Sequence, residues 1–213
     1  AIPFQGIIVS HSNIDEWEKF RNNKLNEAFI DRIYLIKVPY TLRYSEEEKI
    51  YKKMLEHSGL SNAPCAPQTL EMLAQFSVLT RLKEHENSTL FSKMKVYNGE
   101  NMREKDAKAK TIQEYRDAAG VDEGMDGMST RFAFKVLSQT FNYSPKEIAA
   151  DPVHLMVVLE NAIKQEQLGQ SREERYLNFI KSELATRYAE FLGNEIQKAY
   201  IESYQEYGQN LFM

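Results

Sequence analysis

Two short segments near the beginning of the chain are its clearest strand candidates, and they constrain the fold more than any other feature. Residues 6–9 read Gly-Ile-Ile-Val and lead into the polar cluster Ser-His-Ser-Asn at 10–13. Residues 33–38 read Ile-Tyr-Leu-Ile-Lys-Val and stop at Pro39. Apolar, β-branched runs of this length are typical of buried strands in a parallel sheet that helices cover. Two strands are too few for a stable sheet, so the rest of the sheet has to be accounted for.

After Pro39 the pattern changes to helices joined by loops. Capping signals place several boundaries, for example the Ser-x-x-Glu box at 45–48 and Ser129 ahead of an apolar run. The polar stretch 87–110 holds one candidate strand, at 94–97. The expected helices cover residues 45–59, 70–86, 111–119, 129–141 and 152–167.

The last segment begins near Ser171 and is the longest. An apolar stripe recurs at every fourth residue: Tyr176, Ile180, Leu184, Tyr188, Leu192, Ile196, Tyr200 and Tyr204. Gly193 interrupts it at a cost of about 1 kcal/mol relative to Ala. The pattern still runs at Leu211 and Phe212, and the chain begins without an initiator Met. We therefore expect both ends to be cut from a longer protein.

Composition argues against several classes of protein. The 213 residues carry a formal net charge of -4, so no global basic field attracts nucleic acid or acidic membranes. The single Cys65 rules out an internal disulfide and fits a reducing, cytoplasmic compartment. The four histidines lack metal-ligand spacing, and no apolar run approaches the roughly 18 residues that a membrane helix needs. We expect a cytoplasmic protein that binds neither membrane nor nucleic acid.

The usual motifs for nucleotide chemistry do not occur in this sequence. It contains no Gly-x-x-x-x-Gly-Lys-Ser/Thr phosphate loop, no Asp-Phe-Gly or His-Arg-Asp kinase signature and no Gly-x-Ser-x-Gly elbow. We therefore predict that this chain alone neither hydrolyses nor tightly binds ATP, and that it holds no metal.

Three polar positions remain as candidate site residues. Asn13 follows the first strand at the edge where open α/β sheets bind ligands, but an N-cap of the next helix is the simpler interpretation. Arg32 lies between a short helix and the second strand, where a surface cation or a partner of Asp31 is the ordinary interpretation. Arg131 lies in the first turn of a helix, where the helix dipole disfavours a cation. This favours the hypothesis that Arg131 binds an external anionic partner. The alternative for Arg131 is a solvated side chain that pairs with Asp126 or Asp122.

These positions and their surroundings resemble the second half of an AAA+ ATPase module. The resemblance rests on Ser-His-Ser-Asn after a strand, Asn-Glu-Ala-Phe-Ile-Asp-Arg-Ile, Val-Pro-Tyr, and Gly-Met-Ser-Thr-Arg in a helical region. Residues 25–40 and 115–141 are most specifically similar to the bacterial PrkA-type serine protein kinases, and the resemblance extends along essentially the whole chain. It implies that the missing strands, the phosphate loop and the acidic metal-binding strand lie upstream of Ala1.

The resemblance also implies roles for the three residues. Asn13 matches the first sensor, which orients the attacking water or reads the terminal phosphate; Arg32 matches the arginine finger, and Arg131 matches the second sensor on the lid. Cations aimed at the transferring phosphoryl group stabilise its transition state. Because a finger acts across a subunit boundary, the resemblance implies a homo-oligomer. The parent would bind ATP and Mg²⁺ and phosphorylate serine in a protein substrate.

The expected fold class is mainly α, with a partial α/β AAA+ core remnant of two strands, a helical lid and a long C-terminal helix. Residues 1–40 would be the end of the AAA+ core, residues 41–168 the lid-like region, and residues 169–213 the long helical segment. The glycine-rich turn at 124–127 is expected to act as a hinge ahead of Arg131.

Two other functions compete with this interpretation. The parent could be an AAA+ remodelling or proteolysis-linked ATPase without true kinase activity. A helical nucleic-acid module with residues 129–141 as its recognition helix is disfavoured, because that helix offers only Arg131 and Lys135 as cations.

Overall fold

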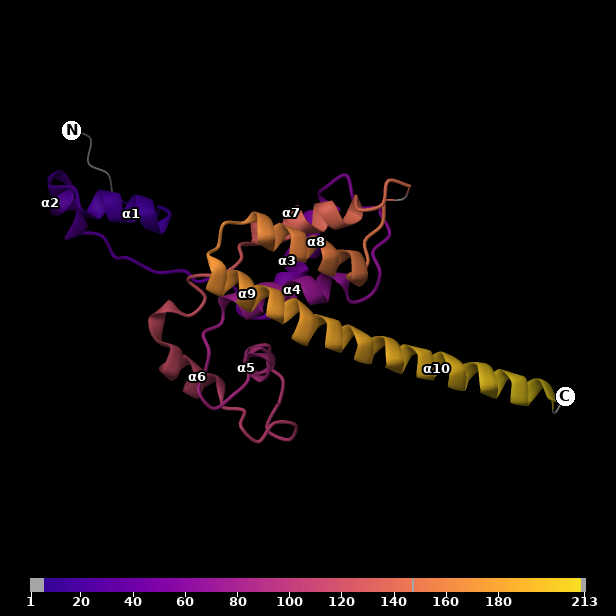
Figure 1. The fold of residues 1–213 in the computed structure, drawn as a ribbon. Helices are drawn as coiled ribbons and strands as arrows, with labels where there is room; N and C mark the ends of the chain where they lie inside the picture. Colours follow the sequence, from indigo (N-terminus) through magenta and orange to yellow (C-terminus); the bar gives the residue numbers. More distant parts are fainter. Residues whose placement is uncertain (1–5, 147, 212–213) are drawn as a thin grey trace. The chain divides into compact units, whose positions relative to one another are not determined.

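The computed structural model describes residues 6–146 and 148–211, and of residues 204–211 it describes the backbone alone. The chain divides into two compact units, residues 1–38 and 39–213. Helices account for 61% of the residues, which confirms the mainly α fold (Figure 1). The predicted division at residues 40 and 168 stays a prediction.

The first unit contains short helical elements with little packing of their own. These are α1 (Ile14–Arg21), a 3₁₀ turn (Lys24–Asn26) and α2 (Glu27–Ile30). Trp17 stacks on Phe20 with 6.0 Å between the ring centroids. None of the residues in these three elements is buried.

The two predicted strands do not form in the part of the chain that the structure describes. Residues 6–13 and 33–38 have no regular secondary structure there. A strand needs a neighbour that takes up its backbone hydrogen bonds, and neither segment has one among the described residues. Their apolar side chains are therefore exposed, at Ile7, Ile8, Val9, Ile33, Tyr34, Leu35, Ile36 and Val38.

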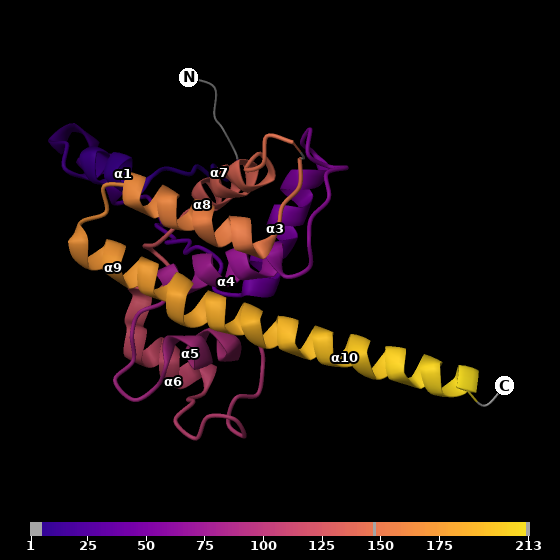
Figure 2. The same ribbon diagram turned by 45° about the vertical axis from the view of Figure 1, so that its right-hand side comes forward.

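The second unit is built around α4 (Thr69–Arg81), a helix with eleven of its 13 residues buried. α3 (Tyr44–Glu56), α7 (Thr130–Phe141) and α8 (Pro152–Gln165) pack against it. α5 (Leu90–Tyr97) also contacts α4, and α6 (Ile112–Ala119) contacts α5. In both views α5 and α6 lie below the long C-terminal helix, while α7 and α8 lie above it (Figures 1 and 2).

Side-chain caps fix several of these helices where the sequence predicted them. The Ser129 Oγ accepts the Phe132 N–H at 3.1 Å and begins α7. The Asp151 carboxylate accepts the N–H groups of Val153 and His154 at 2.8 and 2.9 Å, which begins α8. Each bond satisfies backbone donors that the first helical turn leaves free.

Two sequence-based assignments are wrong. The candidate strand at 94–97 is the second half of α5, which Thr89 caps by accepting the Ser92 N–H. Four residues are too few for an alternating pattern to separate a strand from a buried helix. The capping box at 45–48 also fails, because α3 begins at Tyr44 and its N-cap residue, Arg43, makes no side-chain cap.

The long C-terminal segment is confirmed as far as Leu211. It consists of α9 (Gln170–Asn178), a π-helical stretch (Phe179–Leu184) and α10 (Ala185–Leu211), which follow one another as a single rod (Figure 2). The first three positions of its apolar stripe, Tyr176, Ile180 and Leu184, are buried, and Tyr188 is half-buried. Further along, the stripe is exposed: Leu192 is 40% exposed, Ile196 68% and Tyr200 73%. Tyr204 and Phe212 lie outside the described side chains.

Candidate functional site

Arg131 is an exposed cation in the first turn of α7. None of the described residues gives its guanidinium a hydrogen bond or an ion pair, and Asp126, one of the expected partners, pairs with Arg172. The positive end of the helix dipole also disfavours a cation at this position. The Arg131 guanidinium is therefore a charge at the protein surface without an internal partner among these residues.

A buried ion pair lies beneath the start of this helix. The Arg81 Nη2 is 2.7 Å from the Glu47 Oε1 and the Arg81 Nη1 is 2.9 Å from the Oε2, so the pair is bidentate. The two side chains are only 0% and 1% exposed. Charge-assisted, bidentate pairs of this kind are among the strongest and most directional hydrogen bonds in proteins.

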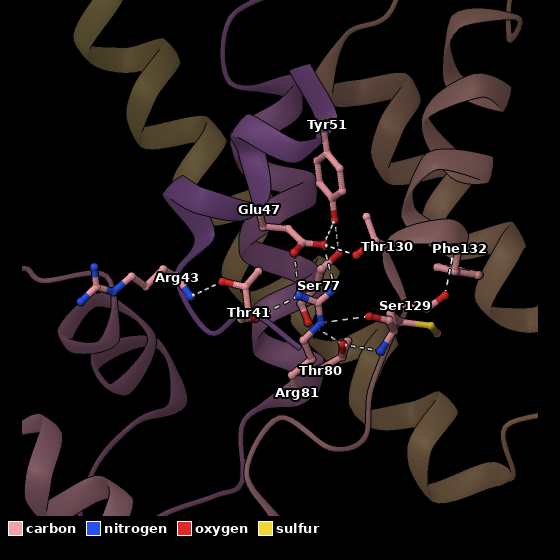
Figure 3. A network of polar contacts seen from close by, with 11 residues as sticks. Thr41, Arg43, Glu47, Tyr51, Ser77, Thr80, Arg81, Ser129, Thr130 and Phe132 are labelled. Carbon is pink, nitrogen blue, oxygen red and sulfur yellow. Dashed lines mark hydrogen bonds and ion pairs between the residues drawn. The ribbon is translucent and has the colours of Figure 1, made fainter. Parts of the chain in front are cut away.

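The Glu47 carboxylate also binds two hydroxyl groups (Figure 3). Its Oε1 accepts the Tyr51 hydroxyl at 2.8 Å and the Thr130 hydroxyl at 3.2 Å. Thr130 is the first residue of α7 and immediately precedes Arg131. One carboxylate thus joins α3, α4 and α7.

The Arg81 guanidinium fastens the segments on either side of this carboxylate. Its Nε donates to the Met128 carbonyl and its Nη1 to the Thr41 carbonyl, both at 3.0 Å. The guanidinium also lies over the Tyr40 ring, 4.8 Å from its centroid. The Met128 N–H donates to the Thr80 hydroxyl at 3.0 Å. The residues just before α7 are therefore held from two sides.

Electrostatics keeps Glu47 ionised in this environment. Burial on its own raises the pKa of the Glu47 carboxyl, but the hydrogen bonds and charge of Arg81, with the Tyr51 and Thr130 hydroxyls, outweigh burial and hold the pKa below its ordinary value of 4.5. Burial and the nearby Glu47 charge raise the pKa of Tyr51 above its ordinary 10.0. Tyr51 therefore stays protonated and donates to a carboxylate.

The glycine turn predicted as a hinge is fastened in this structure. Gly127 has a φ of +105°, and a Cβ there would lie 2.8 Å from the Thr80 carbonyl oxygen and 2.9 Å from the Arg81 Cα. The Gly124 N–H donates to the Arg81 carbonyl at 3.3 Å, and the Gly124 carbonyl accepts the Tyr40 N–H at 2.8 Å. Glycine is required here because the turn approaches the end of α4 too closely for a side chain.

A second buried ion pair lies between α5 and the segment that leads into this turn. The Lys93 Nζ is 2.6 Å from the Glu123 Oε1, with the side chains 1% and 5% exposed. Lys93 also donates to the Lys83 carbonyl at 2.9 Å, and the Tyr97 hydroxyl donates to the Glu123 Oε2 at 3.0 Å. Through this pair, α5 is connected to Lys83, which precedes it in the sequence, and to Glu123, which follows α6.

Asn13 and Arg32 belong to the first unit and are both exposed. Asn13 occupies the N-cap position of α1, but its side chain makes no capping hydrogen bond. The Arg32 N–H donates to the Phe29 carbonyl at 3.0 Å, and its guanidinium has no partner among the described residues. The structure therefore places these two candidates in one unit and Arg131 in the other.

Sequence reasoning missed both buried ion pairs. The signal for Arg81 was present, because this charged residue lies inside the largely apolar stretch 76–82 and charged residues are almost never fully buried without a partner. Glu47 is one of the two intervening residues of the expected capping box at 45–48, and its sequence neighbours indicate no other role for it. Its partner lies 34 residues away, and local patterns do not reveal such a pairing.

Two family models match this chain. The PrkA AAA domain matches residues 1–89, and the PrkA serine protein kinase C-terminal domain matches residues 91–213. The chain belongs to the PrkA family. This agrees with the resemblance that residues 25–40 and 115–141 carry.

Relatives support the same family. The chain is 63% identical over 212 residues to the serine/threonine kinase YeaG of Escherichia coli strain K12, covering 100% of the chain and 33% of that relative. It is 36% identical over 207 residues to the ATP-dependent protease PrkA of Bacillus subtilis strain 168, covering 96% of the chain and 32% of that relative. The chain thus spans about a third of the length of these curated relatives. No solved structure matches.

The boundary between the two PrkA family matches falls inside one structural unit. α3 and α4 lie in the matched AAA domain, whereas α6 to α10 and all of α5 except its first residue, Leu90, lie in the matched C-terminal domain. The Glu47 carboxylate reaches across this boundary to Thr130, and Lys93 reaches across it to the Lys83 carbonyl. The second unit is therefore one packed body made from both matched regions.

Neither a membrane helix nor a metal site stands out in the described residues of this PrkA-family chain. No helix among them combines the length and apolar character needed to cross a bilayer. Within the same residues, no three His, Cys, Asp or Glu side chains are grouped so as to hold a metal ion.

Proposed function

We propose that this chain supplies the sensor and lid elements of the AAA+ ATPase in a PrkA-family serine protein kinase. The observation that carries the proposal is Arg131, an exposed arginine without a partner among the described residues, on a helix whose first turn is tied to a buried ion pair. An arginine fork suits phosphate oxygens, and a cation aimed at a transferring phosphoryl group is most effective on a rigid element.

The other two candidates have complementary roles in this proposal. Asn13, whose side chain is not used as a helix cap, would orient the attacking water or read the terminal phosphate of ATP. Arg32, which is exposed, would act as an arginine finger on the nucleotide of a neighbouring subunit, so the parent would be a homo-oligomer. ATP and Mg²⁺ would be bound by the parent, with its phosphate loop supplied outside this chain.

The partner in the leading proposal is a protein substrate that is phosphorylated on serine, and we propose a cytoplasmic location without membrane or nucleic-acid binding. A second function is favoured by the name of the Bacillus subtilis relative, an ATP-dependent protease. In that case the same sensors would drive a proteolysis-linked ATPase. Incubating the full-length protein with protein substrates and γ-labelled ATP separates the two, because one transfers label to serine and the other produces ATP-dependent cleavage fragments.

The lid role is tested by Arg131→Ala in the full-length protein. We expect ATP turnover at saturating ATP to fall by about tenfold or more, because losing a transition-state cation costs roughly 1.4 kcal/mol or more. The melting temperature without nucleotide should hardly change, since the Arg131 side chain is exposed and has no partner among the described residues.

Lys135→Ala is the matched control for this experiment. Lys135 is an exposed cation one turn further along α7, paired only with Glu166 at 3.6 Å among the described residues. We expect the Lys135→Ala variant to keep the ATP turnover of the unchanged protein. This control distinguishes the loss of the Arg131 guanidinium from the loss of any positive charge on α7. Unchanged turnover in Arg131→Ala, measured on the intact oligomer, would contradict the proposed function.

A further inference from the structure

We propose that Thr130 and Glu47 are positioning residues for Arg131, an inference that rests on the proposed lid role of that arginine. Thr130 precedes Arg131 in the first turn of α7, and its hydroxyl donates to the Glu47 Oε1 at 3.2 Å. The two residues lie 83 positions apart in sequence. This contact joins the matched AAA region to the helix that presents Arg131.

The Glu47 carboxylate is held rigidly enough to fix the orientation of a helix that bonds to it. Two nitrogens of the Arg81 guanidinium and the Tyr51 hydroxyl hold its two oxygens at 2.7 to 2.9 Å. The Tyr51 hydroxyl in turn lies 2.8 Å from the Ser77 hydroxyl of α4. Because the carboxylate is 1% exposed and held from several directions, its oxygens cannot turn to follow a shifting helix.

The residues just before Arg131 are tied to the same ion pair. The Met128 carbonyl accepts the Arg81 Nε, and its N–H donates to Thr80. The Ser129 hydroxyl caps α7, and Thr130 bonds to Glu47 (Figure 3). Three successive residues are thus held in place, which fixes the rotation of the first turn and the direction in which the Arg131 side chain leaves it.

The position of the Arg131 guanidinium matters because a cation stabilises the transition state of phosphoryl transfer much less when it is misplaced. A displacement of about 1 Å at a catalytic group can cost on the order of a hundredfold in rate. A purely structural role for the Thr130 bond makes a different prediction: its loss would lower stability and leave the turnover of folded protein unchanged.

Thr130→Val in the full-length protein tests the proposal. This change removes the hydroxyl, keeps the shape, and leaves Glu47 paired with Arg81 and Tyr51. We expect the kcat of ATP turnover to fall by about threefold or more, as a misaligned cation stabilises the transition state less. Thr130→Ser retains the hydroxyl and should restore turnover.

Thr140→Val is the matched control. Thr140 is a buried threonine on the same helix whose hydroxyl donates to the Val136 carbonyl at 2.9 Å, far from the first turn. The two Thr→Val variants each lose one hydroxyl hydrogen bond of α7, but only Thr130→Val should lose turnover. An equal loss of turnover in both variants, following their loss in melting temperature, would overturn the positioning role.

A double variant shows whether the effect passes through Arg131. In an Arg131→Ala background, adding Thr130→Val should lower turnover no further, because the group being positioned is already gone. A further drop of the same size would overturn the proposal while leaving the role of Arg131 intact. If Arg131→Ala itself had no effect, the proposed function would fail first and the positioning role with it.

Discussion

At the scale of single residues, Glu47 is the point on which the polar contacts of the second unit converge. Its carboxylate binds Arg81, Tyr51 and Thr130, which come from three helices. Taking a carboxylate and a guanidinium out of water costs several kcal/mol for each ion, and close, fully hydrogen-bonded geometry has to offset that cost. Such a site tolerates little change on either side of the pair.

Glu47→Gln should therefore be strongly destabilising at neutral pH. The variant leaves the Arg81 charge buried without its counter-ion, and we expect the free energy of unfolding to fall by about 3 kcal/mol or more. Urea unfolding at pH 7, followed by circular dichroism, measures this difference. A loss below about 1 kcal/mol, the size expected for an exposed pair, would contradict the importance given to this pair.

The same variant gives a pH signature. The pKa of Glu47 is lowered in the folded protein, so the stability that its charge contributes is present above the ordinary carboxyl pKa of 4.5 and is lost as pH falls through the lower folded value. The stability gap between the natural chain and Glu47→Gln should accordingly narrow as pH falls below about 4.5. A gap that stays constant down to pH 3 would show that charge is not what the variant removes.

Sequence reasoning succeeded at residues whose signals are local. Ser129 was predicted as the cap of α7 and Arg131 as a cation in its first turn, because capping and the helix dipole depend on a few neighbouring residues. Glu47 and Arg81 were not predicted as a pair, since their meeting depends on how two helices cross. The positions expected for Asn13 and Arg32 depended on two strands that do not form among the described residues, and the roles of all three site candidates stay predictions. The buried ion pair beneath Arg131 became visible only from tertiary packing.

At the scale of elements, helices were predictable and strands were not. Caps and 3.6-residue periodicity are properties of one segment, so α6, α7 and α8 lie within two residues of their predicted ranges, whereas α4 ends at Arg81 and not at residue 86. A strand depends on a neighbour for its hydrogen bonds, and residues 6–13 and 33–38 have no such neighbour among the described residues. Their composition suits strands of a sheet, but these residues do not form such a sheet by themselves.

The long helix should show two levels of stability. α4 is buried along nearly all its length, whereas the described side chains of α10 from Leu192 to Ser203 are exposed. Amide hydrogen exchange measured by mass spectrometry should be slow in α4 and much faster in α10 beyond Leu192, since opening there breaks few contacts. Similar protection in both would contradict this, and a dilution series would then show whether a second copy covers the exposed stripe.

At the scale of the whole molecule, the family boundary near residue 90 and the structural boundary near residue 38 differ. α4 is the centre of the second unit, yet it belongs to the matched AAA region, while most helices packed on it belong to the matched C-terminal region. A division at residue 90 would remove the helix that these elements are built around.

This leads to a prediction about truncated chains. Residues 39–213 should fold on their own with nearly the same thermal unfolding midpoint as the 213-residue chain, because this unit contains the buried core. Residues 91–213 should show no cooperative transition, since they lack α3 and α4. Scanning calorimetry of both pieces is the measurement. A sharp transition in 91–213 would mean that the C-terminal region has a core of its own.

The continuity of α9, the π-helical stretch and α10 has a mechanical consequence. α10 alone has 27 residues, and at ~1.5 Å per residue it is about 40 Å long. Its first turns follow directly from residues buried against α4, so the rod turns together with the core to which it is fixed. By simple geometry, a rotation of the core by ~10° about the base of such a rod would sweep the far end through ~7 Å. By this geometry, a small rotation of the core would appear at the far end of the helix as a displacement that is large on the scale of a side chain.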